Sequence, residues 1–261
     1  KLQPLLGEGH SRLSVVDAPD VITNHEAPVM AIRSKPNASL VRAYALVREG
    51  QAQALVSAGS TGAVLAGAMF RLGRMEGVER PALAVPVPTV EKPALLLDIG
   101  ANVDCLPEYL EQFAVMGSLY AEKVMGREKP RVALLNIGEE AEKGNAQTKA
   151  AHALMAAEGR PYNFIGNVES RGIALFEADV AVCDGFTGNI LMKSMEGVIK
   201  ALFTLLKQEF MSSTRLKLAG LLASPGFDRI KQRMNADEIG GALLLGVRNA
   251  VVKAHGNSNA H

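Results

Sequence analysis

Short apolar runs alternate with stretches of helical periodicity along most of the chain. Runs of about four apolar residues that end at glycine or a polar residue predict buried strands, whereas apolar positions three and four residues apart predict helices with one buried face. This pattern predicts strands at 13–16, 54–57, 81–89, 94–97, 132–135, 164–165 and 180–183, and a closing hairpin of 243–245 with 250–252. It predicts helices at 39–50, 64–69, 107–124, 148–155, 196–210 and 215–234. Segment 29–33 is too short to assign, and the three prolines in 81–89 favour an edge or irregular strand.

The alternation predicts the α/β fold class, a Rossmann-like layered sheet covered by helices on both faces. With 261 residues, 48% of them hydrophobic, the chain has enough material for one domain spanning 1–261. In such sheets, ligands bind beyond the carboxyl ends of the strands. Five predicted strands end in glycine beside polar side chains, at 57–59, 98–100, 136–138, 166–169 and 183–185. One such turn merely ends a strand, but five of them together predict a shared site.

Two of these turns carry the same motif, G-x-T-G. It occurs at 59–62 and again at 185–188, each time after a strand and before a helical segment. A helix that starts in this way directs free backbone N–H groups and a positive helix end at an anion, so the motif predicts a phosphate site. The alternative is that the glycines only allow a tight turn.

Segment 196–236 predicts a helical hairpin. Its first half carries a single apolar stripe, and the second half carries leucines up to a break expected at 224–227. Seven basic and three acidic residues give 196–234 a charge of +4, in a chain whose total is +1. The hairpin either packs against a dimer mate or places an apolar tip, Leu221-Leu222 to Phe227, in an anionic membrane surface, and the two roles are compatible. The stripe is Ile199, Leu202, Phe203, Leu206 and Phe210.

Charge and cysteine content narrow the class of protein. A net charge of +1 argues against a nucleic-acid-binding protein, which normally carries a basic excess. Cys105 and Cys183 lie far apart and form no C-x-x-C pair, which indicates a reducing compartment and no zinc site. The sequence holds no signal peptide and no apolar run of membrane-spanning length, so we expect a cytoplasmic location with peripheral membrane association.

Five motifs, in this order along the chain, resemble those of bacterial phosphate acyltransferase, the acyl-ACP:phosphate transacylase family. They are Ser57-Ala-Gly-Ser-Thr-Gly-Ala63, Leu97-Asp-Ile-Gly-Ala-Asn-Val-Asp104, Gly166-Asn-Val-Glu-Ser-Arg171, Asp184-Gly-Phe-Thr-Gly-Asn189 and Lys253-Ala-His-Gly256. The resemblance implies a homodimer with a phosphotransacetylase-like or isopropylmalate dehydrogenase-like fold. It implies conversion of fatty acyl-[acyl carrier protein] and orthophosphate to acyl phosphate and free carrier protein, feeding phospholipid synthesis.

The motifs and the resemblance together predict the site residues. Expected catalytic residues are Lys253, His255, Asn167 and Asp184. Expected substrate- and phosphate-binding residues are Ser57, Gly59, Ser60, Thr61, Gly62, Asp98, Asn102, Lys143, Asn145, Arg171, Gly185, Thr187, Gly188, Asn189 and Lys193. No metal and no cofactor are expected. The expected partners are acyl carrier protein, orthophosphate, a second copy of the chain and an anionic membrane surface, with no nucleic acid.

Several alternatives stay open. Cys183 is either an acyl-carrying nucleophile or a buried apolar residue, and His255 is an acid, a phosphate ligand or a structural histidine. The protein is alternatively a phosphotransacetylase that acts on short acyl-CoA, or a non-catalytic phosphate- or nucleotide-binding α/β module.

The chain departs from the family pattern at both ends. The family opens with a strand and a glycine-rich Asp-Ala-Met-Gly-Gly-Asp loop, and neither precedes Leu13 here. The family also continues past the position of His261 into a C-terminal helix. We therefore expect the printed sequence to be part of a longer chain, with the missing loop belonging to the same site.

Overall fold

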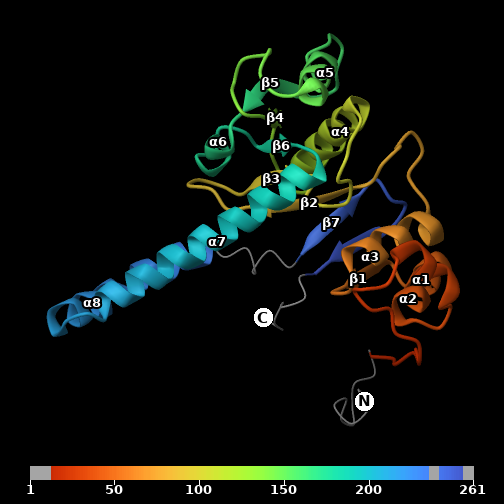
Figure 1. Cartoon of the computed structure of the whole chain (residues 1–261), viewed down its shortest axis with the longest axis horizontal. Helices are drawn as coiled ribbons and strands as arrows, with labels where there is room; N and C mark the ends of the chain where they lie inside the picture. Colours follow the sequence, from red (N-terminus) through yellow and green to blue (C-terminus); the bar gives the residue numbers. More distant parts are fainter. Residues whose placement is uncertain (1–12, 235–240, 255–261) are drawn as a thin grey trace.

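The computed structural model describes residues 13–234 and 241–254, which form one mixed eight-stranded sheet flanked by helices (Figure 1). The strands are β1 (Ala54–Ser57), β2 (Ala82–Val87), β3 (Ala94–Leu97), β4 (Arg131–Leu135), β5 (Asn163–Val168), β6 (Val180–Val182), β7 (Ala242–Leu245) and β8 (Ala250–Lys253). The helices are α1 (Pro28–Ser34), α2 (Ser39–Arg48), α3 (Thr61–Gly67), the π-helical turn η2 (Ala68–Leu72), α4 (Pro107–Lys123), α5 (Ala146–Met155), α6 (Ser170–Ala174), α7 (Gly185–Phe210) and α8 (Thr214–Met234). The predicted α/β class is confirmed.

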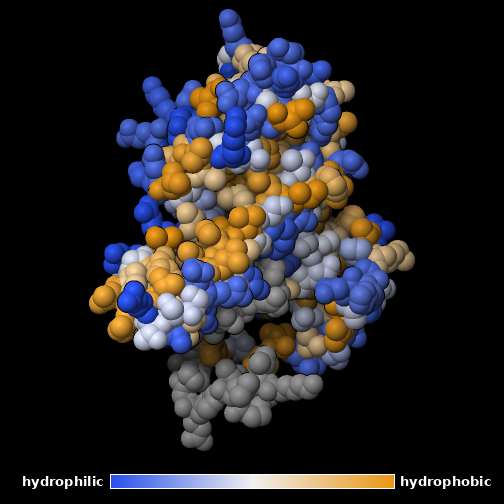
Figure 2. All heavy atoms as spheres, turned by 60° about the vertical axis from the view of Figure 1, so that its left-hand side comes forward, coloured by the Kyte–Doolittle hydropathy of each residue, from blue (hydrophilic) through white to orange (hydrophobic). Residues whose placement is uncertain are grey.

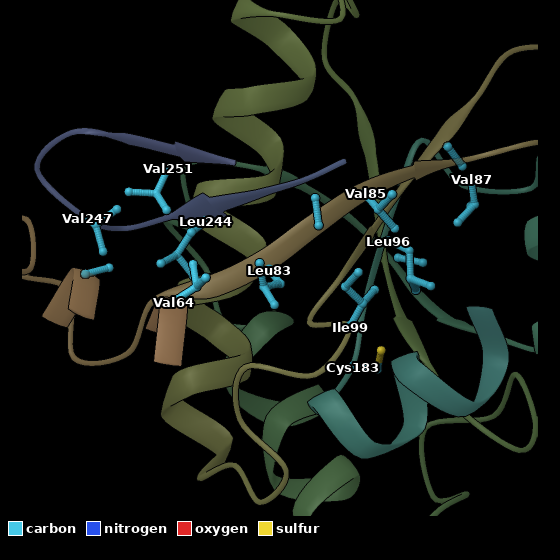
Figure 3. Close-up of a cluster of buried hydrophobic side chains, with 14 of the residues drawn as sticks. Val64, Leu83, Val85, Val87, Leu96, Ile99, Cys183, Leu244, Val247 and Val251 are labelled. Atoms are coloured by element: carbon cyan, nitrogen blue, oxygen red, sulfur yellow. The ribbon is translucent and has the colours of Figure 1, made fainter. Parts of the chain in front are cut away.

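Both faces of the sheet are buried, because alternate residues of each central strand point to opposite sides. Leu95 and Leu97 of β3 join a cluster with Phe113 of α4 on one face. Leu96 joins a cluster on the other face, where Val64 of α3 also packs. Figure 3 shows part of this second cluster, which extends from β8 through β2 and β3 to the start of α7.

Strand β2 lies inside the sheet, so the edge position, one of the two expectations for 81–89, is wrong. The strand order is β1-β8-β7-β2-β3-β6-β4-β5, with β2 antiparallel to both β7 and β3. Pro86 is tolerated there because β7 pairs only with Ala82, Leu83 and Ala84. At Pro86 the missing N–H therefore costs no bond to β7.

The antiparallel β2 also divides the strand ends into two sets. Strands β3, β6, β4 and β5 are mutually parallel, whereas β8 and β1 run in the opposite direction, since β7 is antiparallel to β2 and β8 is antiparallel to β7. The five polar strand ends therefore do not meet at one carboxyl edge of a parallel sheet, and that part of the sequence-based expectation is wrong. The predicted closing hairpin is confirmed as β7 and β8.

The small residues after the first G-x-T-G serve close packing. A Cβ atom added to Gly67 of α3 would lie 2.2 Å from Cε2 of Tyr44 in α2. The Tyr44 hydroxyl donates a 2.6 Å hydrogen bond to the Val64 carbonyl. By contrast, the strand predicted at 13–16 does not form, and Leu13 is 58% exposed. An apolar run makes a strand only where a sheet edge is available to pair with it.

The predicted helical hairpin is present and extends away from the sheet as α7 and α8 (Figure 1). Its turn lies between Phe210 and Thr214, and α8 continues through Pro225, so the break expected at 224–227 is wrong. Proline at 225 removes the N–H that would bond the Leu221 carbonyl. The Ser224 hydroxyl donates to that carbonyl instead, at 3.0 Å, and the helix is maintained. Positions 235–236 of the expected hairpin lie outside the described residues.

Candidate functional site

A cavity of about 1080 Å³ lies between α7, one face of β2, the end of β3 and the turn that joins β1 to α3. Part of its wall is polar and comes from residues near the first G-x-T-G and from the first turns of α7. Six of the predicted site residues line it: Gly59, Ser60, Thr61, Asn189, Lys193 and Lys253.

The first G-x-T-G lines this cavity through Gly59, Ser60 and Thr61. Ser60 is the N-cap residue of α3 and makes no side-chain capping bond, while the Ser57 hydroxyl accepts from the Gly59 N–H at 3.2 Å. Ser57 pairs with Lys253 in the parallel register of β1 and β8, which brings Lys253, the last residue of β8, beside the turn. The fourth motif position, Gly62, packs on Pro28, where an added Cβ would lie 2.7 Å from Cγ.

Two lysines share the polar part of the cavity. The pKa of Lys253 lies below its ordinary value, because the ammonium is partly desolvated and because the charge of Lys193 opposes its own. Lys193 pairs with Glu196 at 2.8 Å on the same helix. A lysine whose charged form is disfavoured by desolvation and by a second lysine favours an anion beside it.

The second G-x-T-G serves packing and capping. The Asp184 carboxylate accepts from the Thr187 N–H at 2.8 Å and from the Thr187 hydroxyl at 2.9 Å, while the Gly185 N–H donates to the Asn102 carbonyl at 2.7 Å. A Cβ on Gly188 would lie 1.9 Å from the Asp98 carbonyl oxygen. These two donors at the start of α7 are therefore already occupied, and the glycines let the helix approach the backbone after β3.

Asp98 anchors the loop that α7 packs against. Its side chain is buried, and its two oxygens accept from the N–H groups of Leu83, Gly100, Ala101 and Asn102 and from the Asn102 amide, at 2.6–3.2 Å. Burial raises the pKa of this carboxyl, and the hydrogen bonds from Ala101, Leu83 and the two Asn102 donors oppose that shift. Asp98 and Asn102 lie outside the cavity lining, so the geometry gives them a positioning role.

The residues predicted from the ends of β4 and β5 lie apart from the cavity. Asn145 caps α5 by accepting from the Thr148 N–H at 2.9 Å, and the Asn167 amide donates to the Glu140 carbonyl at 2.8 Å. Arg171 pairs with Glu169 at 2.6 Å and is largely exposed. Lys143 also lies outside the lining. Their part in substrate binding stays a prediction, and His255 lies outside the described residues.

Cys183 is buried beneath the start of α7. Its thiol lies 3.5 Å from the Asp98 carbonyl oxygen, and burial raises its pKa well above the ordinary value. Cys105 behaves similarly, with its pKa raised to about 12, mainly by burial. Thiols held in the protonated form are poor nucleophiles. Within the described ranges, no three His, Cys, Asp or Glu side chains are placed to hold a metal ion.

Sequence reasoning missed the apolar part of the cavity. The lining there includes Val85 and Val87 of β2 and Met195, Ile199 and Phe203 of α7. Ile199 and Phe203 belong to the apolar stripe predicted for the hairpin. Their helical spacing was the signal in the sequence that could have identified them as part of this wall. Two other residues of that stripe do not line the cavity. Phe210 packs edge-on against Phe227 of α8, and Leu202 is 53% exposed.

The sequence matches one protein family along its whole length. Residues 1–261 match the family model described as fatty acid synthesis protein. A phosphate acyltransferase of Clostridium botulinum (strain Loch Maree / Type A3) is 49% identical over 250 residues, which are 96% of this chain and 74% of the relative. A phosphate acyltransferase of Bacillus cereus (strain B4264) is 51% identical over 249 residues, 95% of this chain and 75% of the relative.

Solved structures show the same fold at low identity. The EutD phosphotransacetylase from Staphylococcus aureus aligns with a TM-score of 0.59 and 17% identity, over 98% of this chain and 78% of the other. A branched-chain phosphotransacylase from Enterococcus faecalis V583 aligns with a TM-score of 0.54 and 18% identity, over 84% and 73%. The family model matches the whole chain, and about half of the chain's residues are identical to those of these phosphate acyltransferases. The chain therefore belongs to the phosphate acyltransferase family of fatty acid synthesis proteins.

Proposed function

We propose that this protein transfers a fatty acyl group from acyl carrier protein to orthophosphate, releasing acyl phosphate for phospholipid synthesis. Family membership supports the reaction. The observation that carries the proposal is the mixed character of one cavity. Its polar part holds Lys253, Lys193 and the first G-x-T-G, and the rest of its wall is largely apolar. An anion and an alkyl chain therefore find suitable surroundings in the same space.

The chemistry needs positioning more than proton transfer. A phosphate oxygen attacks the thioester carbonyl carbon, the carbonyl oxygen becomes an oxyanion, and the C–S bond then breaks to release the carrier thiolate, which takes up a proton from water. Lys253 and Lys193 offset the phosphate charge, while Ser60 and Thr61 offer hydroxyl and backbone donors. Holding the reactants together supplies roughly 7–11 kcal/mol, and each oxyanion donor supplies roughly 3–4 kcal/mol. No covalent enzyme intermediate is required.

The proposed site has a binding layer and a supporting layer. Lys253, Lys193, Asn189 and the turn 59–61 contact substrate. Asp98, Asn102, Asp184, Gly185, Thr187 and Gly188 hold α7 and the loop after β3 at the spacing that the cavity requires.

Acyl phosphate formation tests the function directly. The full-length protein is incubated with palmitoyl-acyl carrier protein and phosphate, with acetyl-CoA in a parallel reaction, and acyl phosphate is trapped with hydroxylamine. We expect product from the carrier-linked acyl chain and a KM for phosphate that rises at least ten-fold in Lys253→Met. Lys123→Met is the matched control, because Lys123 is exposed and pairs with Glu122 outside the cavity. Product from acetyl-CoA alone would favour the phosphotransacetylase alternative, and no product from either donor would favour a non-catalytic module.

We also propose that the protein is cytoplasmic and that its hairpin has two roles. The hairpin packs against the second subunit of a homodimer, and it makes peripheral contact with an anionic membrane. In Figure 2, apolar side chains gather where the hairpin comes forward. The hairpin exposes large apolar side chains along both helices, and 196–234 carries a charge of +4. No helix in the described part of the chain is long and apolar enough to cross a membrane. The exposed side chains include Leu202, Leu205, Leu218, Leu221 and Leu222.

Two measurements separate these roles. Light scattering after size exclusion gives the oligomeric state, and flotation with anionic and neutral liposomes gives membrane binding. Leu221 and Leu222 are 71% and 84% exposed, so changing both to Glu should leave the fold intact and weaken flotation. Flotation equal to that of the unaltered protein would leave dimerisation as the only role of the hairpin.

A further inference from the structure

Three further lysines line the cavity on the two helices of the hairpin. Lys200 and Lys207 lie on α7, seven residues apart, and Lys231 comes from α8, which returns to the cavity near its last turn. Positions seven residues apart are about two turns apart and lie on the same side of a helix. All three side chains are exposed as well as lining the cavity, so they stand at its opening.

The charges of these three lysines are not neutralised by the protein. Among the residues that the structure describes, no carboxylate forms an ion pair with any of the three. Glu196 is the one acidic residue in the described lining, and it pairs with Lys193. A cleft lined by charges of one sign focuses its field and attracts a partner of the opposite sign. The opening of the cavity therefore suits a negatively charged partner.

This partner is distinct from the phosphate proposed to bind beside Lys253 and Lys193. From Lys193 to Lys207 the helix rises about 21 Å, at about 1.5 Å per residue. A hydrogen bond to an anion spans only about 3 Å, so one orthophosphate is too small to contact both ends of this row. The lysines at the opening therefore suit a second, larger anionic group.

The exposed leucines of α7 point away from these lysines. Leu202 and Leu205 are 53% and 63% exposed. They lie two and five residues beyond Lys200, which places them about 160° and about 140° from it around the helix. A membrane surface that takes up these leucines leaves the α7 lysines on the far side of the helix. A second copy of the chain is also a poor match for the lysines, since its own segment 196–234 carries the same charge of +4.

We propose that Lys200, Lys207 and Lys231 form the surface on which the acyl carrier protein docks. The proposal rests on the proposed function and adds to it the place where the protein partner is recognised. The carrier presents its acyl group as a thioester on a phosphopantetheine arm. A cavity of about 1080 Å³ admits the arm but not the folded carrier, whose body stops at the opening. Lysines at that opening select a carrier with acidic side chains around the anionic end of the arm.

Two acyl donors test the docking surface. The full-length protein is assayed with palmitoyl-acyl carrier protein and with palmitoyl-pantetheine, which has the same thioester but neither carrier nor phosphate group. The lysine variant combines Lys200→Glu, Lys207→Glu and Lys231→Glu. We expect the KM for the carrier-linked donor, divided by the KM for palmitoyl-pantetheine, to rise at least ten-fold in this variant, because the reversed charges repel an acidic carrier. Added salt should lower kcat/KM of the unaltered protein only for the carrier-linked donor, since salt screens exposed charges.

The matched control reverses three other charges of the hairpin. The control variant combines Arg215→Glu, Lys217→Glu and Arg229→Glu, whose side chains are exposed and lie outside the cavity lining. It changes the net charge by the same amount as the lysine variant and should keep the KM ratio of the unaltered protein. A rise of equal size in both variants would overturn the proposal, because net charge alone would then explain it. An unchanged ratio in the lysine variant, with flotation on anionic liposomes lost, would overturn it in favour of a membrane contact.

A binding measurement separates this proposal from the proposed function. Absence of acyl phosphate with every donor would refute the function. Titration calorimetry of the full-length protein with palmitoyl-acyl carrier protein, in the absence of phosphate, would then decide the docking surface. A Kd at least ten-fold weaker in the lysine variant than in the control variant supports it. Equal Kd values in the two variants, or no binding to the unaltered protein, refute it.

Discussion

Gly188 provides the sharpest test of how α7 is held against the sheet. A Cβ atom at this position would lie 1.9 Å from the Asp98 carbonyl oxygen, 2.9 Å from the Cys183 sulfur and 3.0 Å from the Asp98 carbonyl carbon. The nearest group is backbone, and the five hydrogen bonds to the Asp98 carboxylate restrain it. Gly188→Ala must therefore displace the first turns of α7 rather than a flexible side chain.

Gly197→Ala is the matched control on the same helix, because a Cβ there would meet nothing within 4 Å. Both substitutions gain about 1 kcal/mol of helix propensity, so the difference between the two variants isolates the clash. Overpacking costs about 1–3 kcal/mol, occasionally more, and a 1.9 Å contact with restrained backbone belongs at the upper end. We expect Gly188→Ala to be less stable than Gly197→Ala by about 3 kcal/mol, while Gly197→Ala slightly exceeds the unaltered protein.

Urea unfolding followed by circular dichroism, at one fixed protein concentration, gives these free energies. Thermal unfolding should show midpoints about 6 °C apart, at about 2 °C per kcal/mol for a chain of this size. Because Asn189 and Lys193 follow on the same helix and line the cavity, Gly188→Ala should also lower kcat, by up to about 100-fold for a shift of about 1 Å. Stabilities of the two variants within 1 kcal/mol of each other would refute the packing explanation of the second G-x-T-G.

The other predictions concern the groups around this helix. Asp98→Asn places an amide among five donors and should lower the free energy of unfolding by about 1–3 kcal/mol, measured in urea, whereas the exposed Asp104→Asn should change it little. The pKa of Lys253 is lowered, so its positive charge is lost from the folded protein at a lower pH than for an ordinary lysine. The KM for phosphate should therefore rise with pH as that pKa is passed, and Lys253→Arg should move the rise to higher pH; identical pH profiles would exclude Lys253 from the phosphate site. Cys183→Ala should keep most of the activity, because the thiol is buried and protonated, and detection of an acylated Cys183 by mass spectrometry would contradict that mechanism.

The sequence by itself determined the local elements and the family. Apolar periodicity correctly indicated the strands at 54–57, 94–97 and 132–135 and the helix that begins at Pro107, because their burial patterns are regular and their ends are marked by glycine, proline or polar residues. Leu110, Phe113 and Ala114 lie three and four residues apart on this helix, and all three are buried. The five motifs identified the family because their residues and order are specific, and the comparisons confirm it.

Only the tertiary structure decided which of the predicted residues share a cavity. Periodicity reports which face of a strand is buried, but not the direction of the strand or the identity of its neighbour. The antiparallel β2 therefore separated strand ends that the sequence had placed at one edge. The two G-x-T-G turns are alike in sequence and differ in surroundings, since one faces the cavity and the other packs on the Asp98 backbone. Lys253 joins the first of them through the pairing of β8 with β1, a contact between distant segments that no local pattern encodes.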